Sequence, residues 1–305
     1  MKINEDKLKE EIYQKIKDSD AQDFYIENRG RFESHLIDKD LLTVQESNQN
    51  DENKKNKIKL KPTEKLIFLK FEEFENLIND INDEFSNEKT ETTNSKNVFI
   101  KAYEIIRDNF GASLQKENKI FLCPYCERNY INVIDVNEDK KIIKPDLDHF
   151  YPKSKYPYLA CSIENLIPAC QFCNQRVKGT LDTFEDVPNP LEVKIFENIS
   201  FNYLNSAIVI FIENKESLND KIKNYIKSFY IEEIYSHHTE ILDDLLDLSR
   251  KYNKVKEKNI YDNCKSFFSR EEINDLIFHS YKYIDKKKTP LWKLRKDLFT
   301  KIISK

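Results

Sequence analysis

Two Cys-x-x-Cys pairs constrain this chain more than any other feature of its sequence. Cys123 and Cys126 form the first pair, and Cys170 and Cys173 form the second. Two residues between cysteines let both thiolates of a tight turn face one ion, and two such turns complete a tetrahedral zinc site. Because four thiolates leave no coordination position open, we expect a structural zinc ion at this site rather than a catalytic one.

Disulfides or a redox dithiol are the alternative uses of these cysteines. The N-terminal residues lack the apolar core of a signal peptide, and no thioredoxin-like βαβ pattern surrounds either pair. We therefore expect metal ligands in a cytoplasmic protein with no membrane span. The other two cysteines, Cys161 and Cys264, are expected to be buried small hydrophobic residues rather than ligands.

The loop between the two pairs is too long for a compact zinc ribbon and must carry something else. Forty-three residues separate Cys126 from Cys170. We expect a strand over Tyr130 to Val136, a turn over residues 137–140 and a returning strand over Lys141 to Ile143. Two further strands would bring an Asp-His pair beside an Asn segment, and a short helix starting near Cys173 would follow them.

Four residues in and after this loop suit the hydrolysis of phosphodiesters. That reaction needs an activated water and a cation beside the phosphate. His149 can take a proton near neutral pH, and Asp148 and Asn174 are hard oxygen ligands suited to Mg²⁺ or Mn²⁺. The amide of Asn165 can tie the loop that bears His149 to backbone groups. Taken singly, each has a plainer interpretation as a loop histidine or a turn cap.

Together, the order Asp148-His149, Asn165, Asn174 resembles the HNH (ββα-metal) endonucleases, in the variant with Asn at the third position. The interleaved cysteines resemble the subclass with a Cys₄ zinc site. The resemblance implies that His149 is the general base, that Asp148 and Asn174 hold a divalent ion, and that Asn165 orients the histidine loop. It also implies products with 5′-phosphate and 3′-hydroxyl ends. Three basic residues adjacent to the motif are candidate phosphate contacts: Lys153, Arg176 and Lys178.

The residues in and around the motif resemble those of the HNH subunits of Septu and some retron anti-phage systems. The similar segments are Cys-Pro-Tyr-Cys, Leu-Asp-His-Phe-Tyr-Pro-Lys-Ser and Asn-Leu-Ile-Pro-Ala-Cys-Gln-Phe-Cys-Asn, within about 60 of the 305 residues. The resemblance implies a defence effector that works with an ABC/SMC-like ATPase. With only 3 glycines, the chain has no Gly-rich phosphate loop of its own. Control of its activity by a nucleotide would therefore have to come from a partner.

The predicted fold class is α+β, with the zinc-pinned finger embedded in a mostly helical chain. We predict a helical region over 1–115, the finger over 116–185, and a β-hairpin followed by helices over 186–305. Loops are expected over Asn48 to Pro62 and Ser86 to Asn97, which have little to bury. Helical spacing of apolar residues supports the N-terminal helices: Leu8, Ile12 and Ile16; Phe71, Phe74, Leu77, Ile78, Ile81 and Phe85; Phe99, Ala102, Tyr103 and Ile106.

Beyond the finger, alternation predicts a β-hairpin from Ile199 to Ile212, and Ser269 with Glu272 predicts a capping box at a helix start. One apolar stripe is expected to include Ile222, Tyr225, Ile226, Phe229 and Tyr230. The basic C-terminal tail with Trp292 is a candidate docking surface, and contact with nucleic acid or plain solvation are equal alternatives.

Other polar residues are weaker candidates. Asp146 could support the metal site or be merely solvated. His237 and His238 are expected to be surface residues or a helix cap, and His35 and His279 are assigned no role.

Three functions compete at this point. The first is a nuclease, which binds nucleic acid, with DNA favoured over RNA. The second is a catalytically silent zinc-finger module that binds nucleic acid or protein, and the third is a structural subunit whose helical flanks do the main work. The net charge of −4 requires any nucleic-acid binding to come from local basic patches.

Overall fold

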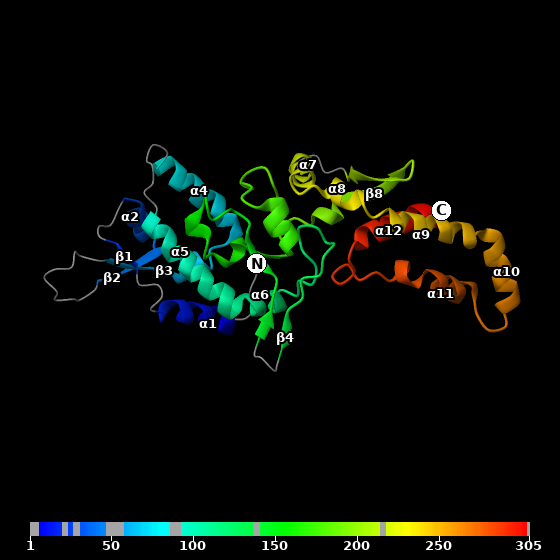
Figure 1. Cartoon of the computed structure of the whole chain (residues 1–305), viewed down its shortest axis with the longest axis horizontal. Coiled ribbons are helices and arrows are strands. Elements are labelled where there is room, and N and C mark those ends of the chain that lie inside the picture. Colours follow the sequence, from blue (N-terminus) through cyan, green and yellow to red (C-terminus); the bar gives the residue numbers. More distant parts are fainter. Residues whose placement is uncertain are drawn as a thin grey trace. The chain divides into compact units, whose positions relative to one another are not determined.

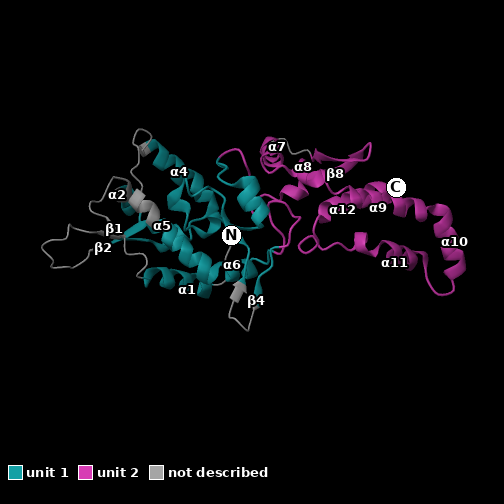
Figure 2. Cartoon of the chain, in the orientation of Figure 1, with its two compact units in different colours: residues 1–120, 131–184 teal, residues 121–130, 185–305 magenta. Residues whose placement is uncertain are grey.

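The computed structural model describes residues 6–19, 24–26, 31–46, 58–85, 93–136, 141–213 and 218–303. The chain divides into two compact units (Figure 2). Unit 1 comprises residues 1–120 and 131–184, and unit 2 comprises residues 121–130 and 185–305. The predicted border between 116–185 and 186–305 stays a prediction. The predicted regions 1–115 and 116–185 fall largely within unit 1, apart from residues 121–130.

Unit 1 contains most of the helices expected from the apolar repeats. Ile12 and Ile16 of α1, and Phe74 and Ile78 of α4, are fully buried, as their spacing predicts. Thr63 accepts a hydrogen bond from the backbone of Leu66 and so caps α3. The helices are α1 (Asp6–Lys17), α2 (Arg31–Asp38), α3 (Glu64–Ile67), α4 (Phe71–Phe85), α5 (Thr93–Ile105) and α6 (Gly111–Glu117), with π-helical residues Ile106–Phe110 between the last two.

The N-terminal region is not purely helical, which corrects the sequence prediction. An antiparallel sheet with strand order β1-β3-β2 is formed by β1 (Phe24–Ile26), β2 (Leu42–Glu46) and β3 (Ile58–Pro62). The predicted loop ending at Pro62 is therefore wrong over β3, where Leu60 is fully buried. The loop predicted up to Asn97 is wrong from Thr93 onward, because α5 starts there. The remainders of both loops, residues 48–57 and 86–92, lie outside the described residues.

Two short antiparallel strand pairs complete unit 1 (Figure 1). β4 (Ile134–Val136) pairs with β5 (Lys141–Ile143), so the first predicted strand is shorter than expected, and its turn lies outside the described residues. β6 (Asp146–His149) pairs with β7 (Leu166–Ala169), followed by a π-helix at Phe172–Lys178. Short 3₁₀ turns at Pro157–Leu159 and Ile163–Asn165 lie in the connection, and α5 packs against the first of them.

In unit 2 the predicted hairpin is followed by helices. β8 (Ile199–Leu204) and β9 (Ala207–Ile212) pair from Ile199 opposite Ile212 to Leu204 opposite Ala207. The Ser269–Glu272 capping box is confirmed, with both reciprocal bonds present. The helices are α7 (Asn219–Ser228), α8 (Ile231–Ser236), α9 (Thr239–Lys251), α10 (Lys254–Cys264), α11 (Arg270–Lys282) and α12 (Trp292–Ile302), with a 3₁₀ turn at Ile195–Glu197.

Two expectations for unit 2 need correction. Tyr230 does not belong to the buried stripe of α7, because the helix ends before it and its backbone takes a φ of 51°, which leaves its side chain exposed. Trp292 is not a surface residue of the basic tail, because it is buried with Leu294, Leu298 and Phe299 on the face of α12 that packs against β8 and α9. A docking role for Trp292 itself is thereby excluded.

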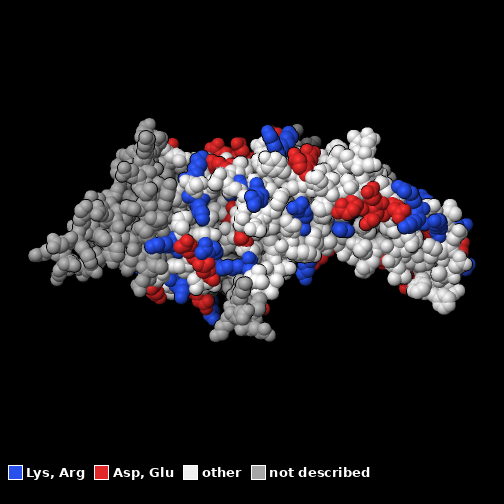
Figure 3. All heavy atoms as spheres, in the orientation of Figure 1, with Lys and Arg blue, Asp and Glu red and all other residues white. Residues whose placement is uncertain are grey.

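The surface carries both signs of charge. Figure 3 shows Lys and Arg side chains interspersed with Asp and Glu on the face drawn, with no single sign covering it. Among the helices that the structure describes, none has the length and apolar character needed to cross a bilayer.

Candidate metal centre and active site

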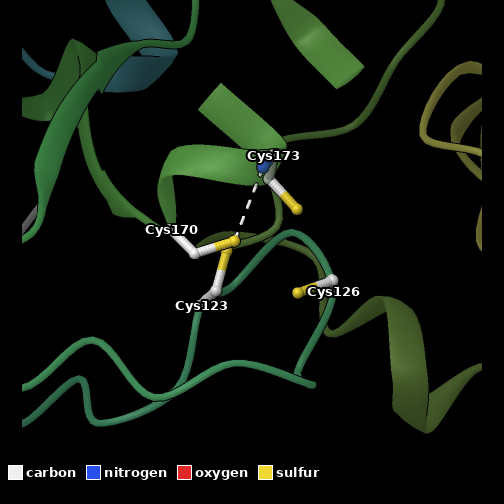
Figure 4. Close-up of side chains that lie close together, drawn as sticks. All are labelled: Cys123, Cys126, Cys170 and Cys173. Atoms are coloured by element: carbon white, nitrogen blue, oxygen red, sulfur yellow. Dashed lines mark hydrogen bonds between the residues drawn. The ribbon is translucent and has the colours of Figure 1, made fainter. Parts of the chain in front are cut away.

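The four cysteines come together as their spacing predicts. One sulfur from each of Cys123, Cys126, Cys170 and Cys173 lies within 4.8 Å of every other (Figure 4), a spacing that suits a single tetrahedral metal ion. The backbone N–H of Cys173 donates to the Sγ of Cys170 at 3.5 Å, an interaction that orients one sulfur. The soft sulfur donors fit zinc, and the cluster could hold such an ion.

The first cysteine turn is shaped by backbone bonds and by buried tyrosines of unit 2. Cys126 and Glu127 both donate their N–H groups to the carbonyl of Cys123, and Cys123 donates to the carbonyl of Asn129. The hydroxyls of Tyr225 and Tyr235 donate to the carbonyls of Tyr125 and Cys126, each at 2.8 Å. Because these carbonyls are buried, the tyrosines satisfy groups that would otherwise destabilise the turn.

The turn is also fixed by α12. The indole Nε1 of Trp292 donates to the carboxyl of Glu127, and the backbone N–H of Leu291 donates to the Glu127 carbonyl at 3.0 Å. Burial raises the pKa of Glu127 to about 7, although the indole bond opposes this. The structure thus gives Trp292 a role that its position in a basic tail did not suggest.

His149 ends β6 and is almost fully buried. Its Nε2 lies 3.0 Å from the carbonyl oxygen of Ala160, so this nitrogen must carry the proton and donate. Its ring packs against Tyr103, with centroids 4.3 Å apart. Burial, and then the charge of Lys153, lower the pKa of His149 to about 3, so the imidazole is neutral at neutral pH. The remaining nitrogen, Nδ1, is therefore the one that can accept a proton.

Asn165 lies inside the loop that follows His149 and ties it together. Its Oδ1 accepts the N–H of Tyr151 at 2.8 Å, and its Nδ2 donates to the carbonyls of Tyr151 and Leu159. The side chain is fully buried, and the carbonyl of Asn165 accepts the N–H of Phe150. Asn165 thus holds the backbone immediately after His149 to the start of β7.

Asp148 forms a buried ion pair that the sequence analysis missed. The Nζ of Lys178 lies 3.2 Å from the Oδ2 of Asp148 and donates to the carbonyl of His149 at 2.6 Å. Both side chains are at most 5% exposed. In this conformation Lys178 faces the strand and not the solvent, which differs from its expected role as a phosphate contact. The position of Lys178 beside the motif indicated a role at the site, but the sequence could not reveal which way its side chain points.

Asn174 lies on the π-helix that contains Cys173. Its Nδ2 donates to the Oδ2 of Asp146 at 3.0 Å, and Gln175 donates to the same oxygen. The amide nitrogen is thereby used, and the amide oxygen is left as a donor for a metal. Asp146 therefore orients Asn174, and its support of a metal site stays a prediction.

The other two candidate phosphate contacts, unlike Lys178, lie at the surface. Lys153 and Arg176 are exposed, so both are accessible to a ligand. The Nζ of Lys153 lies 5.1 Å from the ring centroid of Tyr103, the residue that packs on His149. Tyr103 and its neighbour Arg107 were not singled out by the sequence analysis, which assigned Tyr103 only to a helix core.

Other histidines and cysteines have ordinary surroundings. His35 lies 2.7 Å from Asp80, and His238 occupies the N-cap position of α9 beside Glu240. Cys161 is fully buried, as expected, and burial raises the pKa of its thiol to about 12. Cys264 is only partly buried, so the expectation of a buried core residue does not hold for it.

Part of the chain is similar to a known protein. A segment of 69 residues, 22% of the chain, is 38% identical to a Bacillus thuringiensis protein named Septu protein PtuB. The match covers 23% of that protein's length, so most of both chains lies outside it. No protein-family model and no solved structure matches the sequence. The chain is thus similar, over less than a quarter of its length, to a Septu protein.

Proposed function

We propose that this protein is a metal-dependent nuclease of the HNH kind, with a structural zinc ion at the four cysteines. One observation carries the proposal. Asp148 and His149 end one strand of an antiparallel pair, and Asn174 lies on the helix that follows the other strand, oriented by Asp146 two residues before Asp148. This order of strand, strand and helix is the arrangement that the HNH resemblance implies.

In the proposed reaction His149 is the general base. The bond from Nε2 to Ala160 fixes the tautomer, so that Nδ1 has a lone pair for a proton of the attacking water. Asn165 keeps the ring in place by holding the loop behind it. The neutral state of His149 across the physiological range means that no prior deprotonation is needed.

Asp148 and Asn174 are the residues that would hold a divalent cation. A carboxylate and an amide oxygen are donors that suit Mg²⁺ or Mn²⁺. When bound, such an ion would stabilise the charge on the leaving oxygen. Lys178, already paired with Asp148, would have to share that carboxylate with the ion, and the exposed Lys153 and Arg176 would contact the phosphates of the substrate.

We further propose that the cutting serves anti-phage defence, together with an ATPase partner. The partial similarity to a Septu protein supports this. The motif residues also resemble those of the HNH subunits of such systems. The chain would then act as the effector, and the partner would control when it cuts.

A catalytically silent binding module remains the second candidate, since His149 is buried and Asp148 already has a cation beside it. Plasmid DNA and total RNA would be incubated separately with the protein in Mg²⁺, in Mn²⁺ or in EDTA. Cutting that needs metal and is lost in His149→Ala, but kept in the control His279→Ala, supports the nuclease and names its substrate. Binding without cutting, even when the partner ATPase is added, supports the silent module.

A further inference from the structure

Tyr103, on α5, lies outside the motif but is in direct contact with its histidine. Its ring packs 4.3 Å from that of His149, measured between centroids, and its hydroxyl donates to the carbonyl of Leu147 at 3.3 Å. Tyr103 is 6% exposed, so its ring is packed in the interior. Tyr103 thus connects the end of α5 to β6, one residue away from the proposed metal ligand Asp148.

Two cations lie over this one ring. The Cζ of Arg107 is 5.6 Å from the centroid of Tyr103, and the Nζ of Lys153 is 5.1 Å from it. Each contact is favourable for the ring, which attracts cations. The two positive charges repel each other, however, and they share a ring that packs on His149. An anion placed there would relieve that repulsion.

The chain positions Arg107 with an unusual turn. Residues Ile106–Phe110 form a π-helix, a rare conformation that occurs frequently at functional sites. Lys144, just before β6, donates to the carbonyls of Arg107 and Asp108, which binds this turn to the strand segment. Lys144 also adds a third positive charge to the same surface.

Asp108 orients the guanidinium group without covering it. Its carboxylate accepts hydrogen bonds from Nε of Arg107 at 2.7 Å and from Nη2 at 3.0 Å. Nη1 takes no part in these two bonds. The Arg107 side chain is 40% exposed. A guanidinium held in plane by one carboxylate loses little freedom when it binds a phosphate with its remaining N–H groups. Other carboxylates also act on this region, Glu104 on Arg107 and both Asp146 and Asp148 on Tyr103, so the binding capacity lies in the oriented N–H groups and not in a net positive charge.

We propose that Arg107 and Lys153, arranged over Tyr103, form a clamp for phosphate groups of the nucleic-acid strand next to His149. The inference rests on the proposed function for the identity of the anion, and it assigns a binding role to α5, a helix outside the motif. Tyr103 is a positioning residue in this clamp, because it contacts Arg107, Lys153 and His149 and not the reacting atoms.

Binding would be measured in an Asn174→Ala background, which blocks cutting but keeps His149 and Tyr103. Fluorescence anisotropy with labelled single-stranded and double-stranded oligonucleotides would be recorded over a range of salt. Arg107→Ala and Lys153→Ala are each expected to weaken binding about tenfold and to lower the slope of log K against log salt by about 1. Arg107→Lys keeps the charge but loses the fork, so it should fall between Arg107→Ala and the parent.

The matched control is Lys116→Ala, which removes another half-exposed cation of unit 1 that is paired with an acid, Asp135. Its affinity should stay within about twofold of the parent. The clamp is overturned if Arg107→Ala binds as Lys116→Ala does, or if no variant, the parent included, binds nucleic acid. Metal-dependent cutting by the wild-type chain is scored separately. A protein that loses binding in Arg107→Ala but never cuts would keep the clamp and refute the nuclease.

Discussion

The buried pair of Asp148 and Lys178 gives the sharpest stability prediction. At 3.2 Å and an effective dielectric constant of about 20, the attraction between the two charges is about 5 kcal/mol before desolvation is subtracted. Lys178→Met would leave Asp148 charged, buried and unpaired, and would remove the bond to the carbonyl of His149. Breaking such a pair costs about 3–5 kcal/mol, so we expect a loss in that range.

The assay is urea unfolding followed by circular dichroism, in EDTA and then in saturating Mg²⁺ or Mn²⁺. A divalent ion at Asp148 would replace the lost cation, so metal should restore stability to Lys178→Met, by about 2.7 kcal/mol at a hundredfold excess over its Kd. The double variant Asp148→Leu with Lys178→Met should show no such recovery. The matched control is Lys155→Met, which breaks an exposed pair with Asp182 and should cost at most about 1 kcal/mol.

Two results would refute this reasoning. A loss of less than about 1 kcal/mol in Lys178→Met would mean that the pair is not buried as described. Equal recovery by metal in the single and the double variant would mean that the ion binds somewhere other than Asp148.

Three further predictions concern the cysteine cluster, the α11 capping box and the protonation of His149. Cys126→Ser should reduce bound zinc, measured by elemental analysis, from one ion per chain to a small fraction, whereas Cys264→Ser should leave it unchanged. Ser269→Ala should destabilise α11 by about 1 kcal/mol, seen as faster amide exchange in its first turn, and Ser280→Ala on the same helix should not. Because the folded-state pKa of His149 is lowered to about 3, the unfolded chain binds a proton more readily below pH 6.5. Stability in EDTA should therefore fall as the pH drops from 6.5 toward 3, by about 2 kcal/mol at pH 5, and His149→Asn should remove that part of the dependence.

Local patterns predicted much of the fold. The buried faces of α1 and α4, the β8–β9 hairpin and the capping box of α11 all follow from residues close together in the sequence. The cysteine cluster was predictable for a similar reason, since each Cys-x-x-Cys turn determines its own geometry and only the meeting of two turns had to be inferred.

Non-local pairing explains what the sequence did not reveal. The strands β1, β2 and β3 are only three to five residues long. Apolar residues alternate with polar ones at Leu42 and Val44 and at Ile58 and Leu60, but runs this brief do not mark a sheet before the strands pair. Trp292 is surrounded by lysines in the sequence, but α12 turns it inward against Glu127. Lys178 was recognisable as a neighbour of the motif, whereas its direction depends on where β6 lies.

The central claim is that His149 activates the water in a metal-dependent cut. The most direct measurement is the single-turnover cleavage rate of the wild type and of His149→Ala on the same substrate, at saturating Mn²⁺, with bound zinc and melting temperature checked in both. Loss of a general base should lower the rate by about 10²- to 10⁴-fold while zinc content and folding stay unchanged. A His149→Ala protein that cuts at the wild-type rate would contradict the account.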